Sequence, residues 1–480
     1  METLKEKTAK GLMWGGLGNG VLQLLNLVFG IFLARLLSQT DYGMVGMLAI
    51  FSALAGVLQE GGFVSALNRK KEVTHNDYNA VFWTGLLISL TLYIIFFFCA
   101  PLIARFYGRP ELTPLARYIF LGFVVSGFGT VPGAYMFRNM MVRERNVIAV
   151  ASMLFSGIAG VTMAACGFAY WGIATQAILL SLSTVCLMYW YTRWRPSLPI
   201  DFTPVKEMIG FSSKLIITNA LLAVNNNIFT VLLGRLYTPH AVGNFTQGYK
   251  WNNMGSSLIT NMFNSIAQPV FSKTEADTAH QKDIFRKLLR LTAFVSFPLM
   301  LTLSVTSREF IVILLTEKWE ESSQILQLLC LAGAFTPVST LFSNLLISRG
   351  FSTIFMNNTA ALVVLQLIAL LVSAPFGIHT MVAIYVCINI VWLLVWFYYV
   401  RREIGLTFLE TARDIAPYAG LAAVLACAAW LIAKPIQNIY LCFVFKVLFV
   451  GGGYGLVLWL LRSSVLKETM TFIKNKKLSQ

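Results

Sequence analysis

Residues 79–101 read NAVFWTGLLISLTLYIIFFFCAP and contain no Asp, Glu, Lys or Arg. About 20 consecutive apolar residues in a helix are enough to cross the hydrocarbon core of a bilayer. This stretch therefore predicts a transmembrane helix. The rest of the chain has the same character, because 57% of its 480 residues are hydrophobic and only 12% are charged. Since a soluble domain carries roughly 25% charged residues, we expect the bilayer to be the solvent for most of the chain.

Further runs of this length raise the predicted number of transmembrane helices to about fourteen. They lie near residues 11–34, 42–67, 79–101, 115–137, 147–168, 171–191, 210–233, 241–268, 288–306, 323–347, 354–374, 379–400, 415–433 and 439–461. The second, seventh and eighth runs contain more polar residues than the others. The predicted fold class is an all-α, polytopic membrane protein.

The positive charges indicate how these spans are oriented. If the N-terminus is cytoplasmic, about 26 of the 37 Lys and Arg fall in segments on the inner side, about eight on the outer side and three inside spans. Short cytoplasmic loops are enriched in Lys and Arg, so we expect both termini to be cytoplasmic. The net charge of +16 is explained by this bias, and no nucleic-acid partner is predicted.

An internal repeat is visible when the sequence is shifted by 200 positions. Eleven residues of the first two spans recur in the seventh and eighth. The first copy has Asn19, Leu22, Asn26, Phe29, Leu33, Arg35, Leu36, Gly43, Leu58, Phe63 and Ser65, and each is repeated 200 positions later. A shift of 205 pairs Pro132, Phe137 and Asn139 with Pro337, Phe342 and Asn344.

The repeat predicts two six-helix lobes with the same orientation in the membrane, because six spans separate the copies. We expect residues 1–192 to form the N-lobe and residues 193–402 the C-lobe. Residues 403–480 would add two further helices and a cytoplasmic tail. Transporters built from parallel repeats bind substrate between the repeats and rock them alternately open, so the pattern favours a transporter.

The eighth span has a polar face. Its polar residues are spaced by three or four positions, which places them along one side of a helix. They are Thr246, Lys250, Asn253, Ser257, Asn261, Asn264 and Gln268. The functional interpretation is the wall of a wet cavity that binds sugar hydroxyls. The alternative is a helix–helix interface held together by amide hydrogen bonds.

Amides recur on the first and seventh spans, partly at positions related by the repeat. They are Asn19, Gln23 and Asn26 in the first span and Asn219, Asn225 and Asn226 in the seventh. An amide both donates and accepts hydrogen bonds, which suits an uncharged polyol. We expect these side chains to line a cavity together with the eighth span.

Charged residues inside spans are the remaining site candidates. Lys214, Lys250 and Lys446 are candidate contacts to an anionic group such as a pyrophosphate. Lys214 and Lys446 are equally consistent with snorkelling or partner pairing. Glu60 is a candidate coupling or gating residue, although it is equally consistent with an ordinary solvated residue at a helix end. Arg35 and Arg235 are candidate gate residues, but a helix C-terminus attracts Arg in any case.

Signatures of enzymes and metalloproteins are missing from the sequence. It contains no Walker A motif, no GxSxG, no HExxH and no Cys/His spacing typical of a metal site. Loops are short and leave no room for a soluble catalytic domain. We therefore expect no enzyme activity, no cofactor and no metal, apart from a coupling ion such as H⁺ or Na⁺.

Several motifs resemble one known family in their order along the chain. They include LKEKTAKGLMW at 4–14, FLARLLSQTDYGMVGML at 32–48, GRLYTPHAVGNFTQGY at 234–249 and FNSIAQPVFSKTE at 263–275. Together they resemble the polysaccharide exporters, the O-antigen and colanic-acid-type flippases of the multidrug/oligosaccharidyl-lipid/polysaccharide superfamily. The resemblance covers nearly the whole chain and implies fourteen helices around a central cavity lined by the first, second, seventh and eighth.

The function implied by this resemblance is to flip polyprenyl-pyrophosphate-linked oligosaccharide repeat units across the bacterial inner membrane. It further implies contact with membrane lipids and, as partners, a polysaccharide polymerase and glycosyltransferases. The last two helices would bracket a groove for the lipid tail. Two alternatives stay open: a multidrug or small-cation antiporter, which would need acidic cavity residues, and a lipid II flippase, which would need more cavity arginines.

Overall fold

The computed structural model of the chain is all-helical over the residues it describes, which are 4–60, 64, 67, 70, 72–198, 201–274 and 277–461. Side chains are described within these ranges except at 4–17, 60, 206–215 and 273. The chain divides into two compact units, residues 1–243 and residues 244–480. The predicted boundaries at 192 and 402 remain predictions.

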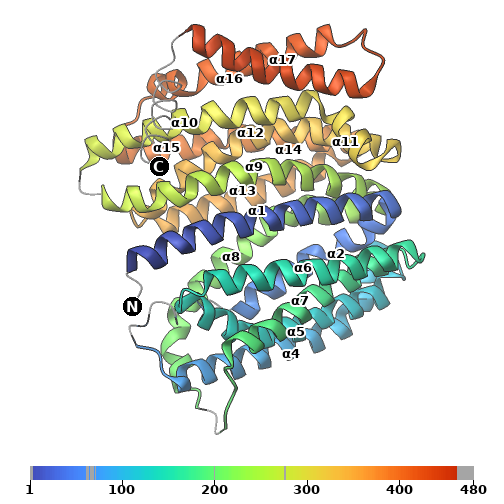
Figure 1. Ribbon diagram of the computed structural model, residues 1–480, viewed down its shortest axis with the longest axis vertical. Helices are drawn as coiled ribbons and strands as arrows, with labels where there is room; N and C mark the ends of the chain where they lie inside the picture. Colours follow the sequence, from blue (N-terminus) through green and yellow to red (C-terminus); the bar gives the residue numbers. More distant parts are fainter. Residues whose placement is uncertain are drawn as a thin grey trace. The chain divides into compact units, whose positions relative to one another are not determined.

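The first unit contains seven long helices among its described residues (Figure 1). They are α1 (Leu4–Leu36), α2 (Gln39–Glu60), α4 (His75–Tyr107), α5 (Leu112–Arg138), α6 (Val142–Ala165), α7 (Tyr170–Thr192) and α8 (Thr203–Leu236). α4 packs along α5, α6 along α7, and α1 along α6. α8 packs against α2 and α4 in the same unit.

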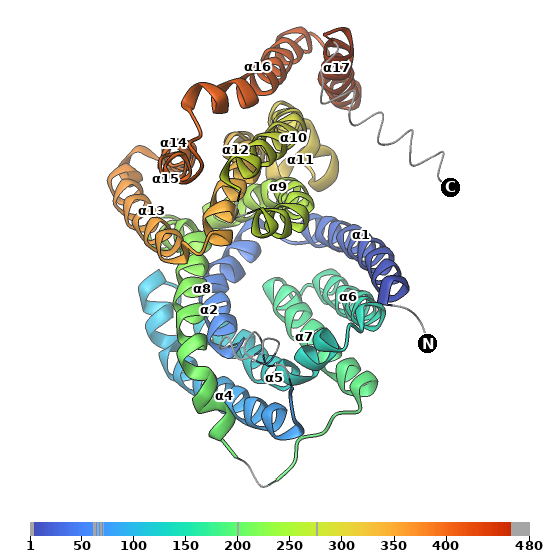
Figure 2. The same cartoon turned by 90° about the vertical axis from the view of Figure 1, so that its left-hand side faces the viewer.

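The second unit begins within α9 (Pro239–Lys273). Its other helices are α10 (Thr278–Val305), α11 (Ser307–Leu315), η1 (Glu317–Trp319), α12 (Glu320–Ser348), α13 (Ser352–Ser373), η2 (Ala374–Phe376), α14 (Ile378–Val391), α15 (Leu393–Ile404), α16 (Phe408–Ile432) and α17 (Ile439–Leu460). α16 packs along α10, and α17 packs on α16, α10 and α11 (Figure 2).

Short-range side-chain contacts define where several helices begin. Thr74 and Asp77 form a capping box at the start of α4, and Thr407 and Glu410 form the same motif at α16. In each case the hydroxyl and the carboxylate accept hydrogen bonds from backbone N–H groups that the helix leaves unpaired. Asn438 caps α17 with its side-chain oxygen. These caps fix the first residues of the helices and permit the short connections that the sequence predicts.

Thirteen helical segments within the described ranges are long and apolar enough to cross a membrane. α9 has 35 residues, so it is long enough, but it is not among the thirteen. Its polar face accounts for the difference. Large apolar side chains remain exposed on the peripheral helices, for example Leu448 at 67% and Val424 at 66%. Such side chains suit contact with lipid, which confirms a polytopic membrane protein, whereas the count of fourteen spans remains a prediction.

Residues 307–322, which connect the predicted spans 288–306 and 323–347, are mostly helical, because α11 and η1 occupy Ser307–Leu315 and Glu317–Trp319. Ile311, Leu315 and Trp319 are completely buried. Ile311 and Leu315 are four residues apart and share one face of α11, whereas Trp319 belongs to η1. The short length of this apolar face is why the sequence did not identify it as a helix.

Repeat-related residues have matched environments. Leu33 and Leu233 are buried, Asn26 and Asn226 are exposed. The clearest match is at the starts of α2 and α9. A Cβ atom added to Gly43 would overlap the carbonyl of Pro239, and one added to Gly243 would overlap the carbonyl of Gln39. The start of α2 and the start of α9 therefore approach each other so closely that neither glycine position can hold a Cβ atom.

Replacing Gly43 by Val is expected to destabilise the protein, because the new side chain must separate two backbone segments. Overpacking of this kind costs about 1–3 kcal/mol. The measurement is thermal unfolding of the purified protein in detergent. Gly20→Val is the matched control, since Gly20 lies in α1 with no atom near its Cβ position. Equal stability of the two variants would show that the backbones do not approach each other here.

Candidate functional site

α9 has a buried face and a polar face that differ in exposure. One face is buried and includes Trp251, Ile259 and Phe263, at 2%, 2% and 5% exposure. The predicted polar face is not buried, because Asn253 and Asn261 are exposed. Lys250, Ser257 and Asn264 on the same face are partly exposed, and Gln268 is exposed. The alternative of a dry interface therefore does not describe most of this face.

The residues on the polar face of α9 differ in whether their side chains are hydrogen-bonded to described residues. Asn264 accepts a hydrogen bond of 2.7 Å from the Asn344 side chain on α12, so it does join helices. Asn253 and Asn261 make no side-chain hydrogen bond to any residue within the described ranges. Their amides are thus free to bind water or a ligand.

Lys250 has no carboxylate partner among the described residues. Its Nζ atom lies 5.8 Å from the centre of the Trp251 ring, which is a weak cation–π contact. Trp251 is fixed by an edge-to-face contact with Phe310 at 5.2 Å. A cation in a membrane helix without an acidic partner requires water or an anion. This environment is consistent with the predicted role of Lys250 in binding an anionic group.

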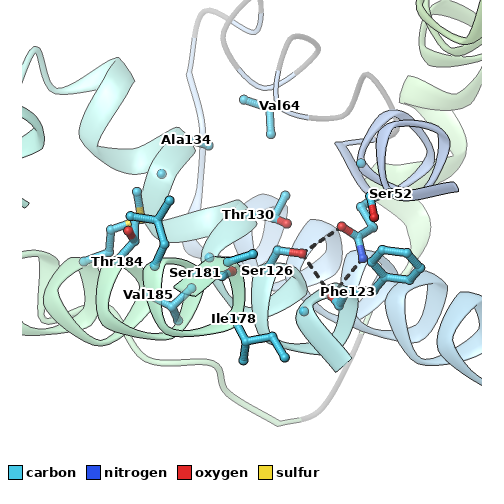
Figure 3. A pocket seen from close by; sticks show the side chains of 18 of the residues that line it. Ser52, Val64, Phe123, Ser126, Thr130, Ala134, Ile178, Ser181, Thr184 and Val185 are labelled. Carbon is cyan, nitrogen blue, oxygen red and sulfur yellow. Dashed lines mark hydrogen bonds between the residues drawn. The ribbon is translucent and has the colours of Figure 1, made fainter. Parts of the chain in front are cut away.

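Two cavities lie in the first unit, and they share part of their walls. The larger (Figure 3) has a volume of about 810 Å³ and is lined by residues of α2, α5 and α7. Arg145 of α6 also lines it. The smaller has a volume of about 550 Å³ and is lined by α1, α6 and α7. Arg145 and Thr184 line both cavities. The larger is in the size range of protein pockets that bind small ligands.

The predicted amides of α1 take part in these cavities. Asn19 and Asn26 line the smaller one, whereas Gln23 is partly exposed and lines neither. On α8, Asn219 and Asn226 are exposed, and the Asn225 Oδ1 atom is buried without a hydrogen-bond partner in the described part of the chain. None of the α8 residues whose side chains the structure describes lines either cavity. The structure therefore brings two of the six predicted amides into a cavity.

The gate and coupling candidates are only partly described. The side chains of Glu60 and Lys214 lie outside the described residues. Arg35 and Arg235 are exposed at the ends of α1 and α8, and the Arg235 guanidinium lies 5.8 Å from the Phe106 ring. These contacts suit helix-terminal arginines, and a gating role remains a prediction.

The lining of the larger cavity includes polar side chains that were not predicted from the sequence. Gln59 on α2 donates a 2.8 Å hydrogen bond to the Phe123 carbonyl and accepts a 2.9 Å bond from Ser126 on α5 (Figure 3). Further hydroxyls come from α2, α5 and α7. The signal for these residues was weak, because Ser and Thr are common in membrane helices, where they often bond the preceding turn.

Lys446, unlike Lys250, is paired with a carboxylate inside its membrane helix bundle. Its Nζ atom on α17 lies 2.7 Å from Glu309 Oε1 on α11 and donates a hydrogen bond of 3.0 Å to the Val305 carbonyl. Both side chains of the ion pair are more than nine-tenths buried. Lys446 is therefore a structural cation, and partner pairing is the correct one of its predicted alternatives.

A second ionic cluster joins α10 and α16. Arg286 Nε lies 2.8 Å from Asp414 Oδ2, and Arg286 also contacts Glu410 at 3.3 Å. Lys282 contacts Glu410 at 2.9 Å. Lys282 and Arg286 of α10 thus bind the first part of α16 through its carboxylates. Within the described ranges, no group of His, Cys, Asp or Glu has the arrangement of a metal site.

The geometry defines a multi-pass helical membrane protein with ligand-sized cavities in its first unit, whose mainly apolar walls carry a few polar side chains. The model of the polysaccharide biosynthesis protein family matches residues 32–324, which is more than half of the chain, and the chain belongs to that family. Among curated relatives, the lipopolysaccharide biosynthesis protein WzxC of Escherichia coli K12 is 25% identical over 354 residues, covering 72% of this chain and 71% of that protein. The teichuronic acid biosynthesis protein TuaB of Bacillus subtilis 168 is 21% identical and covers 82% of each chain.

Solved structures show the same fold at low sequence identity. The lipid II flippase MurJ, in an inward closed conformation, matches with a TM-score of 0.77 and 14% identity, covering 96% of this chain and 100% of that chain. An inward-facing multidrug resistance transporter of the MATE family in the MOP superfamily matches with a TM-score of 0.66 and 16% identity, covering 80% and 94%. The chain therefore has the fold of this superfamily.

Replacing Lys446 by Met is expected to lower the free energy of unfolding by about 3–5 kcal/mol, because Glu309 becomes an unpaired buried charge. The double variant Lys446→Met/Glu309→Gln should recover part of that loss. Arg308→Gln is the control, since the ion pair between Arg308 and Glu320 is exposed and such pairs contribute little. Chemical unfolding in mixed micelles measures all four proteins. Equal losses in the single and double variants would contradict a coupled pair.

Proposed function

We propose that this protein is a flippase that moves polyprenyl-pyrophosphate-linked oligosaccharide repeat units across the bacterial inner membrane, for export of a surface polysaccharide. The observation that carries the proposal lies on the polar face of α9, where no hydrogen bond or ion pair from a described residue occupies the side chains of Lys250, Asn253 and Asn261. Membership of the polysaccharide biosynthesis protein family supports the substrate class.

The proposed mechanism is alternating access. The saccharide head group enters a polar site from the cytoplasmic side while the prenyl chain stays in the lipid. Rocking of the two lobes then exposes the sugar outside, driven by a gradient of H⁺ or Na⁺ or by removal of the product. Parallel repeats are the usual architecture for such motion, and the matched environments of Gly43 and Gly243 support that relation.

The chemistry of the lining favours a saccharide over an organic cation. The described residues that line the two cavities of the first unit include no Asp or Glu, and the one charged residue among them is Arg145. A site for cations needs acidic groups, whereas hydroxyls and amides suit sugar hydroxyls. This composition argues against the multidrug antiporter alternative. The lipid II flippase alternative is disfavoured because it calls for several cavity arginines.

We further propose that the protein has no enzymatic activity of its own and that both termini are cytoplasmic. Polymerisation of the exported units would fall to a polysaccharide polymerase, and their synthesis to glycosyltransferases. The topology is supported by the excess of Lys and Arg in the inner segments.

Lys250→Ala is expected to reduce surface polysaccharide and to cause lipid-linked oligosaccharide to accumulate, at an unchanged amount of protein. Asn261→Leu should act in the same direction, because it removes one amide from the polar face of α9. Met262→Leu is the matched control, since Met262 is exposed on another face of the same helix. The measurement is quantification of both glycan pools in a deletion strain that carries each variant. If the Lys250→Ala and Asn261→Leu variants export glycan normally, the polar face of α9 is not part of the substrate-binding site.

A further inference from the structure

Four hydroxyls around the larger cavity have no hydrogen-bond partner in the described part of the chain. They belong to Ser52 on α2, Thr130 on α5, and Ser181 and Thr184 on α7 (Figure 3). All four side chains are partly exposed. They come from three helices, so no single helix accounts for the group.

Other hydroxyls in the same helices behave differently. Ser183, two residues from Ser181, donates a 2.6 Å hydrogen bond to the Leu179 carbonyl. Thr192 donates a 2.8 Å bond to the Met188 carbonyl. This bond to the preceding turn is the usual solution for Ser and Thr in a membrane helix. The four cavity hydroxyls do not use it, which leaves them available to bond water or a ligand.

Arg145 supplies a positive charge at the wall shared by the two cavities. Its guanidinium lies 5.3 Å from the centre of the Phe137 ring, another residue of the larger cavity. It makes no hydrogen bond or ion pair with side chains in the described ranges. By contrast, Arg138 at the end of α5 donates hydrogen bonds to the carbonyls of Leu67 and Lys70. A guanidinium without a partner is suited to bind a phosphate or carboxylate group with two parallel hydrogen bonds.

From these observations we infer that the larger cavity is a subsite for a phosphorylated or acidic saccharide. Ser52, Thr130, Ser181 and Thr184 bond the sugar hydroxyls, and Arg145 binds an anionic oxygen group attached to the same sugar. The inference rests on the proposed function for the choice of a saccharide. It places a recognition site inside the first unit, in addition to the polar face of α9.

Direct binding to the purified full-length protein tests the subsite. The probes are glucose 1-phosphate, glucose and inorganic phosphate, titrated by calorimetry in detergent micelles. Thr130→Val and Ser181→Ala should each weaken binding of glucose 1-phosphate and of glucose by about two- to twelvefold, the range for loss of one neutral hydrogen bond. Ser183→Ala is the matched control and should bind as the unaltered protein does.

The anionic half of the inference has its own pair of variants. Arg145→Gln should weaken binding of glucose 1-phosphate and phosphate by about tenfold or more and leave glucose binding unchanged. Arg143→Gln removes the same charge from the same inner segment, so it controls for the effect on membrane orientation. Arg143 lies outside both cavities. An equal effect of the two Arg variants would show that Arg145 acts only through the overall charge.

The outcomes separate the subsite from the proposed function. If the unaltered protein binds none of the three probes saturably, or if Thr130→Val, Ser181→Ala and Arg145→Gln all match their controls, the subsite is overturned. Glycan export, measured in the same strains, reports on the flippase function independently. If these variants bind the probes normally and also export glycan normally, the subsite is overturned and the proposed flippase function stands. If the variants show the selective binding defects but the unaltered protein exports no lipid-linked glycan, the subsite is supported and the proposed flippase function is overturned.

Discussion

A polar side chain within a bilayer must bond to protein, to water or to a ligand, because the hydrocarbon offers no partner. This chain meets that constraint in two ways. Lys446 and Glu309 bond to each other in a buried pair, whereas Lys250, Asn253 and Asn261 keep their polar groups unbonded by any described residue. The first arrangement holds helices together. Polar side chains without a protein partner are stable only where water or substrate reaches the helix. The functional proposals depend on that access.

The bonded groups are concentrated where α16 and α17 meet the rest of the second unit. The pair between Lys446 and Glu309 fixes α17 to α11, and Arg286 with Asp414 fixes α16 to α10. Neither helix is deeply packed, since many of their large apolar side chains are exposed. Removing one partner of the buried pair is therefore expected to be costly, because it leaves an uncompensated charge away from water.

The sequence was sufficient to predict the long apolar helices and the polar face of α9, because each is a pattern along one segment. It could not predict the partner of Lys446, which lies 137 residues away in the chain. Arg145 was counted as one of the topogenic charges, since position in a loop segment says nothing about which cavity a side chain lines. The hydroxyls of Ser181 and Thr184 were missed for a similar reason: only the fold distinguishes them from Ser183, which bonds its own helix.

The wetting of α9 is the claim that supports the rest, and thiol labelling measures it directly. Asn253, Asn261 and, for comparison, Ile266 are each changed to Cys in a protein whose seven native cysteines have been replaced. A hydrophilic, membrane-impermeant maleimide is then applied to inside-out and right-side-out vesicles. We expect the Cys at 253 and 261 to react from at least one side and the Cys at 266, exposed on the apolar face, to remain unlabelled. Protection of 253 and 261 from both sides, or equal labelling at 266, would contradict a wet polar face.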